Sequence, residues 1–280
     1  MRILVLGATG LLGSFLKHYL QKKTYIKIFP TGFAKKSKYY LNLLDRNSVL
    51  KFFKSKKPDV IINCAAQTNV DECQKNFYFG YKGNVLIVKN IVLAIKQLKF
   101  KPHFIHFSTD QVYNNKGKRK NSEHQINLTN NYSITKYLGE LEAKKIIRST
   151  IIRTNFFGKS FLKKRRTFSG FVIHNLLKGK KVRVPANIIY NPVSLDYIAR
   201  ILELIILKKK IGIYNLGSRD SISKYNFCSM LQKRYDLNPN LVISYLSNYY
   251  KDKRPLNTSL SSKKLEKSLG IKVPFIKDMI

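Results

Sequence analysis

The sequence predicts an α/β protein, a Rossmann-type doubly wound parallel sheet with a smaller mixed α/β substrate-binding lobe. In the first half of the chain, short β-branched runs alternate with stretches of helical periodicity, which is typical of parallel strands joined by helical crossovers. The first run, Arg2–Leu6, leads directly into a glycine-rich turn at Gly7. The chain has 280 residues, which fits one large α/β domain or two lobes.

The expected elements follow from hydrophobic periodicity and from the Gly and Pro residues that bound it. In the first half we expect strands at residues 2–6, 26–29, 60–63, 104–107 and 151–153, and helices at 11–21, 46–54, 85–98 and 131–148. Beyond Thr154 the pattern becomes mixed, with helices at 168–177, 194–207 and 224–235 and strands at 182–184 and 213–216. We therefore expect a dinucleotide-binding domain at 1–155, to which 191–217 return, and a substrate-binding lobe made of 156–190 and 218–280.

The formal charge of +38 has two interpretations. It could mark a polyanionic partner such as nucleic acid or an acidic membrane surface. It could also reflect lysines spread over every solvent face, and the one dense block is Lys163–Arg166. The wide spread favours the second interpretation, so we expect no specific nucleic-acid partner. A positive field would still favour a phosphate-bearing substrate or cofactor.

Cysteine usage and hydropathy indicate a cytoplasmic protein. The three cysteines form no CxxC pair, which is typical of reduced thiols. The N-terminus starts a strand at once and does not resemble a signal peptide. The apolar run Ile201–Leu207 is far below the roughly 20 residues that a membrane-spanning helix needs. His103 and His106 would point to opposite faces of a strand, so we expect no metal site.

A glycine-rich loop follows the first strand. Gly7, Gly10 and Gly13 are spaced three and three between that strand and a helix. In dinucleotide-binding folds the first glycine permits a tight turn, the second lets backbone amides approach a pyrophosphate, and the third lets helix and strand pack closely. The helix N-terminus would add free N–H groups and the positive end of its dipole. This context predicts a dinucleotide site.

The end of the second strand bears on the choice between NAD and NADP. A carboxylate there would hold the ribose 2′-hydroxyl of NAD. The stretch from Phe29 to Lys38 has no carboxylate and contains Lys35, Lys36 and Lys38, which suit a 2′-phosphate. Because lysine is abundant everywhere, this favours NADP(H) over NAD(H) without excluding the latter.

Tyr132 and Lys136 form a Tyr-x-x-x-Lys element in a helical stretch, which puts both side chains on one face, one turn apart. A tyrosine hydroxyl with a reference pKa of about 10 exchanges protons poorly at neutral pH, and a nearby ammonium favours its phenolate. Such a pair can act as a general acid toward a carbonyl oxygen. Alone, the element also fits an exposed pair in a Tyr- and Lys-rich chain. Its context adds weight, because Thr109 ends a preceding strand at the edge of the sheet where ligands bind.

The chain resembles the extended short-chain dehydrogenases and, within them, the dTDP-4-dehydrorhamnose reductases. The resemblance covers nearly the whole chain and rests on ordered motifs at residues 7–13, 58–68, 70–71, 84, 108–113, 132–136, 139–140, 153–158, 191–192 and 254–255. It implies NAD(P)H-dependent reduction of the 4-keto group of a nucleotide-linked deoxysugar, for cell-surface polysaccharide precursors.

The resemblance also implies residue roles. Tyr132 would donate the proton, Lys136 would support it and contact the nicotinamide ribose, and Thr109 would bind the sugar carbonyl. The implied cofactor-binding residues are Gly7, Thr9, Gly10, Leu11, Leu12, Gly13, Asp45, Arg46, Ala65, Ala66 and Gln67, with Tyr132 and Lys136. The implied substrate-binding residues are Thr109, Asp110, Asn84, Phe156 and Arg254.

Departures from the family pattern leave alternatives open. Asn187 stands where the family has Asp, Phe156 where it often has Trp, and Tyr113 where Phe is more usual, which leaves the sugar undefined. A nucleotide-sugar epimerase or dehydratase of the same superfamily is one alternative. Another is a non-catalytic NADP-binding subunit, because the regulatory subunit of methionine adenosyltransferase resembles this family. Helices 85–98 and 131–148 could pair across a homodimer.

Overall fold

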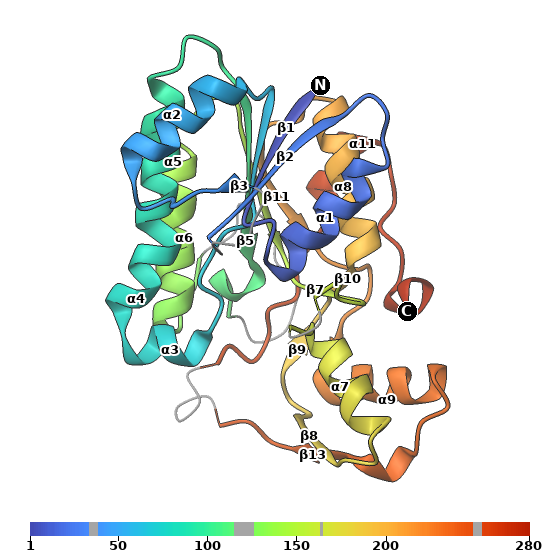
Figure 1. The fold of residues 1–280 in the computed structure, drawn as a ribbon. Coiled ribbons are helices and arrows are strands. Elements are labelled where there is room, and N and C mark those ends of the chain that lie inside the picture. Colours follow the sequence, from blue (N-terminus) through green and yellow to red (C-terminus); the bar gives the residue numbers. More distant parts are fainter. Residues whose placement is uncertain (34–38, 115–125, 163–164, 249–253) are drawn as a thin grey trace. The chain divides into compact units, whose positions relative to one another are not determined.

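The computed structural model describes residues 1–33, 39–114, 126–162, 165–248 and 254–280. These residues include a seven-stranded sheet with flanking helices (Figure 1). The sheet contains β1 (Arg2–Leu6), β2 (Lys27–Gly32), β3 (Tyr39–Tyr40), β4 (Val60–Asn63), β5 (His103–Thr109), β6 (Ser149–Thr154) and β11 (Gly212–Leu216). Its strand order is β11-β6-β5-β4-β1-β2-β3. The predicted doubly wound α/β fold is confirmed.

The strand order reverses next to β1. The chain runs from β1 outward through β2 to β3, then returns to the other side of β1 as β4, and all these pairings are parallel. In doubly wound sheets this reversal opens a crevice at the carboxyl ends of the two central strands, where ligands bind. The topology thus brings the turn at Gly7, after β1, to the same edge as Cys64 and Ala65, after β4.

Helices cover both faces of this sheet (Figure 1). The helices of this part of the chain are α1 (Leu11–Gln21), α2 (Arg46–Lys56), α3 (Val70–Lys75), α4 (Phe77–Tyr81), the π-helix η1 (Lys82–Leu86), α5 (Ile87–Lys96), α6 (Asn131–Ala143) and α8 (Leu195–Leu207). The apolar core between the sheet and α2, α5 and α6 includes Leu4, Phe53, Ile91 and Ile151. On the other face, Tyr19 of α1 donates a hydrogen bond of 2.6 Å to Glu203 of α8.

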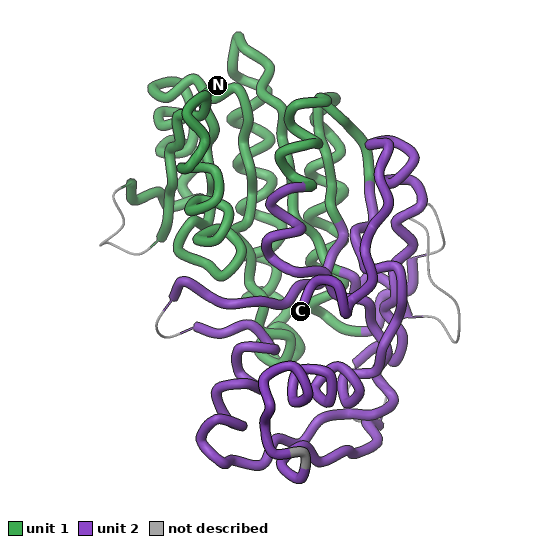
Figure 2. Tube along the Cα trace, turned by 90° about the vertical axis from the view of Figure 1, so that its right-hand side faces the viewer, with its two compact units in different colours: residues 1–109, 130–152, 201–213 green, residues 110–129, 153–200, 214–280 purple. Residues whose placement is uncertain are grey.

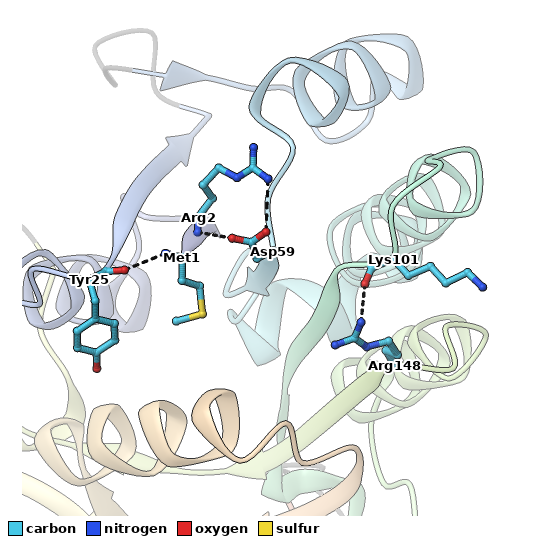
Figure 3. A network of polar contacts seen from close by, with 6 residues as sticks. All are labelled: Met1, Arg2, Tyr25, Asp59, Lys101 and Arg148. Carbon is cyan, nitrogen blue, oxygen red and sulfur yellow. Dashed lines mark hydrogen bonds and ion pairs between the residues drawn. The ribbon is translucent and has the colours of Figure 1, made fainter.

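Polar contacts fix the register of the strands at the amino edge of the sheet (Figure 3). The backbone N–H of Arg2 donates to Oδ2 of Asp59 at 2.7 Å, and the N–H of Asp59 donates to the carbonyl of Arg2 at 2.8 Å. The N-terminal ammonium donates to the carbonyl of Tyr25 at 2.9 Å, and Arg148 donates to the carbonyl of Lys101 at 3.1 Å. These bonds lie at the edge opposite the carboxyl ends of the strands.

By contact density the chain divides into two compact units (Figure 2). Unit 1 comprises residues 1–109, 130–152 and 201–213, and unit 2 comprises 110–129, 153–200 and 214–280. The second unit therefore takes in 110–129, 153–155, 191–200 and 214–217, which the sequence had assigned to the first domain. Among the residues that the structure describes, no helix is long and apolar enough to cross a membrane.

Unit 2 is built from short elements around an aromatic core. Its strands are β7 (Phe156–Phe157), β8 (Val182–Pro185), β9 (Ile189–Tyr190), β10 (Val193–Ser194), β12 (Ile222–Ser223) and β13 (Val242–Tyr245). Its helices are α7 (Phe168–Leu176), α9 (Lys224–Arg234), α11 (Lys263–Leu269) and the 3₁₀ turns η2 (Asp110–Val112), η3 (Pro239–Leu241) and η4 (Ile276–Met279). The fully buried Phe227 meets Phe157 edge-on at 5.2 Å and Tyr190 edge-on at 5.8 Å between ring centroids.

Two predicted helices differ from the observed ones by more than two residues at one end. The helix expected over 131–148 ends at Ala143, and the chain turns before β6 begins at Ser149. The helix expected over 85–98 begins earlier, because the π-helix η1 precedes α5. A π-helix inserts an extra residue into a helical turn and is frequent at functional sites, and here it contains Asn84.

Candidate active site

The glycine loop is packed so tightly that only glycine fits at two of its three positions. Gly7 has φ 76°, and a Cβ there would lie 2.6 Å from the backbone nitrogen of Ala65. A Cβ on Gly13 would lie 2.2 Å from the carbonyl oxygen of Gly7. At Gly10 the nearest atom to a Cβ is the carbonyl oxygen of Gly7, at 3.3 Å. The first and third glycines are thus required by packing, whereas Gly10 leaves the backbone open to an approaching group.

The N-terminus of α1 offers backbone donors at this loop. Gly10 is the N-cap, no side chain caps the helix, and its first α-helical bond runs from the N–H of Ser14 to the carbonyl of Gly10 at 2.9 Å. The amides of Leu11, Leu12 and Gly13 precede that bond and can donate to an anion, aided by the helix dipole. The open backbone at Gly10 and these donors fit the pyrophosphate of a dinucleotide.

The segment after β4 is held by two buried asparagines. Asn63 accepts from the N–H of Ala65 at 3.1 Å, and its amide nitrogen meets Nδ1 of His106 at 3.0 Å. Asn84 accepts from the N–H of Gln67 at 2.9 Å and donates to the carbonyl of Gln67 at 3.1 Å. These bonds fix residues 65–67 beside the glycine loop, as a wall of the predicted cofactor site.

Asn84 therefore has a positioning role in the described structure. Its side chain is 1% exposed, and its amide also donates to Oγ1 of Thr135 at 3.0 Å. Contact between Asn84 and substrate stays a prediction, one that these bonds to the protein do not favour.

Tyr132 and Lys136 lie on α6, which is anchored at its start. The N-cap Asn130 accepts from the N–H of Ser133 at 2.8 Å, and Oγ of Ser133 accepts from the N–H of Asn130, which completes a capping box. Tyr132 follows in the first turn and is 7% exposed, in contact with a small apolar cluster that includes Cys73. Lys136 lies one helical turn further along the same face.

The ammonium of Lys136 is buried and joins α6 to the end of β5. It donates to the backbone carbonyl of Phe107 at 2.8 Å, two residues before Thr109. Burial lowers the pKa of Lys136 to about 8, although the nearby carboxylate of Glu140 acts in the opposite direction. The same burial raises the pKa of the Cys64 thiol, so Cys64 is not poised as a nucleophile.

Glu140 is a functional candidate that the motif analysis did not single out. It is fully buried, lies two turns from Tyr132 on α6, and accepts a hydrogen bond of 2.5 Å from Oγ of Ser108. It supplies a negative charge that partly compensates the buried Lys136. The sequence does show that Glu140 lies on the same helix face as Tyr132 and Lys136, at i+8 and i+4 spacing from Tyr132 and Lys136. It does not show that Ser108 of β5 bonds to Glu140.

The substrate-side candidates Asp110, Phe156 and Arg254 belong to unit 2. Asp110 is 3% exposed, and its Oδ2 accepts from Nδ2 of Asn155 at 3.0 Å and from Oγ1 of Thr258 at 2.6 Å. Phe156 and Arg254 are half-buried. Thr109, Tyr132 and Lys136 all belong to unit 1.

The remaining cofactor candidates have local roles or lie outside the described residues. Asp45 caps α2, accepting from the N–H groups of Asn47 and Ser48 at 3.0 and 3.1 Å. The hydrogen bond from the Ser48 hydroxyl, followed by these backbone bonds, lowers the pKa of Asp45. Cofactor binding by Asp45 and Arg46 stays a prediction. The lysines at 35, 36 and 38, which carried the preference for NADP, lie outside the described residues, as do Lys163 and Lys164.

Comparison with known proteins gives the family. The family model described as the RmlD substrate binding domain matches residues 1–280. The chain belongs to this family. The resemblance to the dTDP-4-dehydrorhamnose reductases is thereby confirmed at the level of the family.

Individual relatives are consistent with this family. The spore coat polysaccharide biosynthesis protein SpsK of Bacillus subtilis is 27% identical over 278 residues, 95% of this chain and 91% of that protein. The dTDP-4-dehydrorhamnose reductase of Aggregatibacter actinomycetemcomitans is 29% identical over 294 residues, 96% of this chain and 94% of the relative.

Solved structures share the fold over the whole chain. A dTDP-4-dehydrorhamnose reductase from Clostridium acetobutylicum superposes with a TM-score of 0.87 at 25% identity, covering 100% of this chain and 96% of that one. The enzyme of that name from Bacillus anthracis, in complex with NADP, has a TM-score of 0.87 at 22% identity, covering 99% and 96%.

Proposed function

We propose that this protein is a reductase that transfers a hydride from NAD(P)H to the 4-keto group of a nucleotide-linked deoxysugar. The observation that carries the proposal is the buried Lys136, one turn from Tyr132 on α6 and hydrogen-bonded to the β5 strand that ends in Thr109. The curated relatives named for reduction of dTDP-4-dehydrorhamnose and for spore coat polysaccharide synthesis support the substrate class and a role in polysaccharide precursors.

The proposed roles follow from the chemistry of these side chains. When bound, the nicotinamide supplies the hydride to the carbonyl carbon. Tyr132 donates its hydroxyl proton to the carbonyl oxygen as negative charge develops there, and Thr109 donates a hydrogen bond to the same oxygen. The ammonium of Lys136 stabilises the phenolate left on Tyr132, because opposite charges a turn apart attract strongly in a buried site.

The cofactor is proposed to lie across the carboxyl edge of β1 and β4. The amides at the start of α1 would donate to the pyrophosphate, and the segment 65–67 would flank it. NADP(H) is favoured over NAD(H) by the lysine-rich, carboxylate-free sequence after β2. Unit 1 is then the cofactor-binding domain.

The test is NADPH oxidation by the purified protein with dTDP-4-dehydrorhamnose, followed at 340 nm. The expected result is one NADPH consumed for each sugar reduced, and loss of at least about a hundredfold in kcat in Tyr132→Phe, since a general acid contributes roughly 10²–10⁴-fold. Tyr81→Phe, on a half-buried tyrosine of α4, is the matched control and should keep activity. NADPH binding without turnover of this or other nucleotide-linked keto sugars would contradict the proposal and favour a regulatory subunit.

A further inference from the structure

Unit 2 contains a polar cluster that the proposed chemistry does not use, around Lys224 and Tyr190. Strand β9 pairs antiparallel with β12, so that Tyr190 lies opposite Ile222, and the N–H of Lys224 donates to the carbonyl of Ile188 at 3.0 Å. Lys224 is the first residue of α9, which Ser223 caps by accepting from the N–H of Asn226 at 3.1 Å. The backbone thus fixes Lys224 beside the strand that carries Tyr190.

The ammonium of Lys224 lacks a hydrogen-bond acceptor within the described part of the chain. It lies 5.4 Å from the centroid of the Phe168 ring, and that ring stacks on Phe227 at 6.5 Å. Burial lowers the pKa of Lys224, and the positive charge of Arg254 lowers it further. A buried ammonium over an aromatic ring is stabilised only in part, because three N–H donors remain to be satisfied.

The carboxylate that faces this lysine already has other partners. Asp110 attracts Lys224 electrostatically, but its Oδ2 accepts from Asn155 and Thr258 at 3.0 and 2.6 Å. Lys224 therefore lies near a carboxylate whose Oδ2 is already engaged by uncharged donors. A buried ammonium in these surroundings attracts a further anion.

Tyr190 adds a second unsatisfied donor. The residue is 4% exposed, and its hydroxyl has no hydrogen-bond partner among the described residues. Burial raises the pKa of Tyr190 well above its usual value, and Cys228 and Asp110 raise it further. Cys228 and Asp110 also act on Lys224, and the pairing of β9 with β12 places Lys224 next to the strand that carries Tyr190, so the hydroxyl and the ammonium lie in one neighbourhood. Buried polar groups are nearly always hydrogen-bonded in folded proteins, so an orphan hydroxyl here points to a ligand.

We propose that Lys224 and Tyr190 bind the diphosphate of the nucleotide-linked substrate, the ammonium and the hydroxyl both donating to phosphate oxygens. Phosphate supplies the charged acceptors that both groups lack, and charge-assisted hydrogen bonds of this kind are the strong ones. This assignment rests on the proposed function for the identity of the nucleotide sugar. The anion site itself rests on the geometry of unit 2.

The test is calorimetric titration of the full-length protein with dTDP, thymidine and inorganic pyrophosphate. Lys224→Met should weaken dTDP binding by roughly tenfold or more, since a hydrogen bond to a charged group is worth about that factor. Tyr190→Phe should weaken it by roughly threefold to tenfold. Lys233→Met, on an exposed lysine of the same helix, is the matched control and should change binding by less than about twofold.

The folded state gives an independent readout. Removal of an orphan hydroxyl should leave the melting temperature of ligand-free Tyr190→Phe unchanged or slightly higher, whereas loss of a structural hydrogen bond would lower it. Wild-type dTDP affinity in Lys224→Met, equal binding of thymidine and dTDP, or no dTDP binding by the wild type would each overturn the proposal. If dTDP or pyrophosphate binding depends on Lys224 while no keto sugar is reduced, the anion site stands and the proposed reductase activity fails.

Discussion

The three glycines of the loop after β1 should respond differently to substitution, because the structure gives them different surroundings. In Gly13→Ala the new Cβ would lie 2.2 Å from the carbonyl oxygen of Gly7 and 3.0 Å from Cα of Ala8, so α1 must shift away from the loop. Overpacking of this kind costs about 1–3 kcal/mol. For a chain of this size that corresponds to a fall in melting temperature of roughly 2–12 °C.

Gly10→Ala should instead weaken the binding of NADPH and leave the stability of the protein nearly unchanged. Its Cβ meets the carbonyl oxygen of Gly7 at 3.3 Å, and its φ of −88° suits any residue. Alanine is a poorer N-cap than glycine, which lowers the free energy of unfolding, but it also restricts the unfolded chain, which raises it. Each effect is about 1 kcal/mol or less, so stability should change little. The methyl group would stand where the pyrophosphate approaches, and we expect NADPH affinity to fall by roughly tenfold or more.

The assays are thermal unfolding and NADPH fluorescence titration of both variants and the wild type. Wild-type NADPH affinity in Gly10→Ala would refute the assignment of this loop to the pyrophosphate. Wild-type melting temperature in Gly13→Ala would refute the packing argument, since the clash involves backbone atoms that cannot rotate away.

Other predictions concern charged groups. The pKa of Lys136 is lowered to about 8, so the rate of reduction should fall as pH rises through that value and the ammonium beside Tyr132 loses its proton; a flat kcat profile from pH 7 to 10 would contradict this. The pKa of Lys136 in the folded protein lies below its value of about 10.4 in the unfolded chain, so the unfolded chain binds more protons between about pH 8 and pH 10.4. The free energy of unfolding should therefore rise with pH across that range. Glu140→Gln removes a charge that favours the ammonium and should shift the alkaline limb of the kcat profile to lower pH; an unchanged limb would argue against coupling. Glu203→Gln weakens the cluster with Tyr19 and Lys23 and should cost about 1–2 kcal/mol in urea unfolding at pH 7.

Much of the fold was predictable because local signals agreed with the tertiary structure. The helix Leu11–Gln21 matched its predicted bounds, since a glycine turn precedes it and its apolar face is periodic. The predicted helix to Arg148 extended too far because neither Gly nor Pro marks its end, whereas the observed helix ends at Ala143. Apolar character alone does not show which aromatic residues are buried, since Phe77 and Tyr78 are 42% and 59% exposed.

The site was predictable only where a motif combines spacing with a structural context. Tyr132 and Lys136 were found because i, i+4 spacing on a helix is visible in sequence. The partners of Asn84 and Glu140 were not, because both depend on which segments the fold brings together. Lys224 was hidden among 53 basic residues, and it is distinguished by its burial and by the lack of an acceptor for its ammonium among the described residues.

The most direct test of the central claim is transfer of the hydride itself. Purified protein would be incubated with dTDP-4-dehydrorhamnose and NADPH carrying two deuterium atoms at C4 of the nicotinamide, and the sugar product analysed by mass spectrometry and NMR. The account predicts one deuterium at C4 of the sugar and one NADP⁺ for each product. A product without deuterium, or conversion of the sugar without consumption of NADPH, would contradict it and indicate an epimerase or dehydratase that recycles its cofactor.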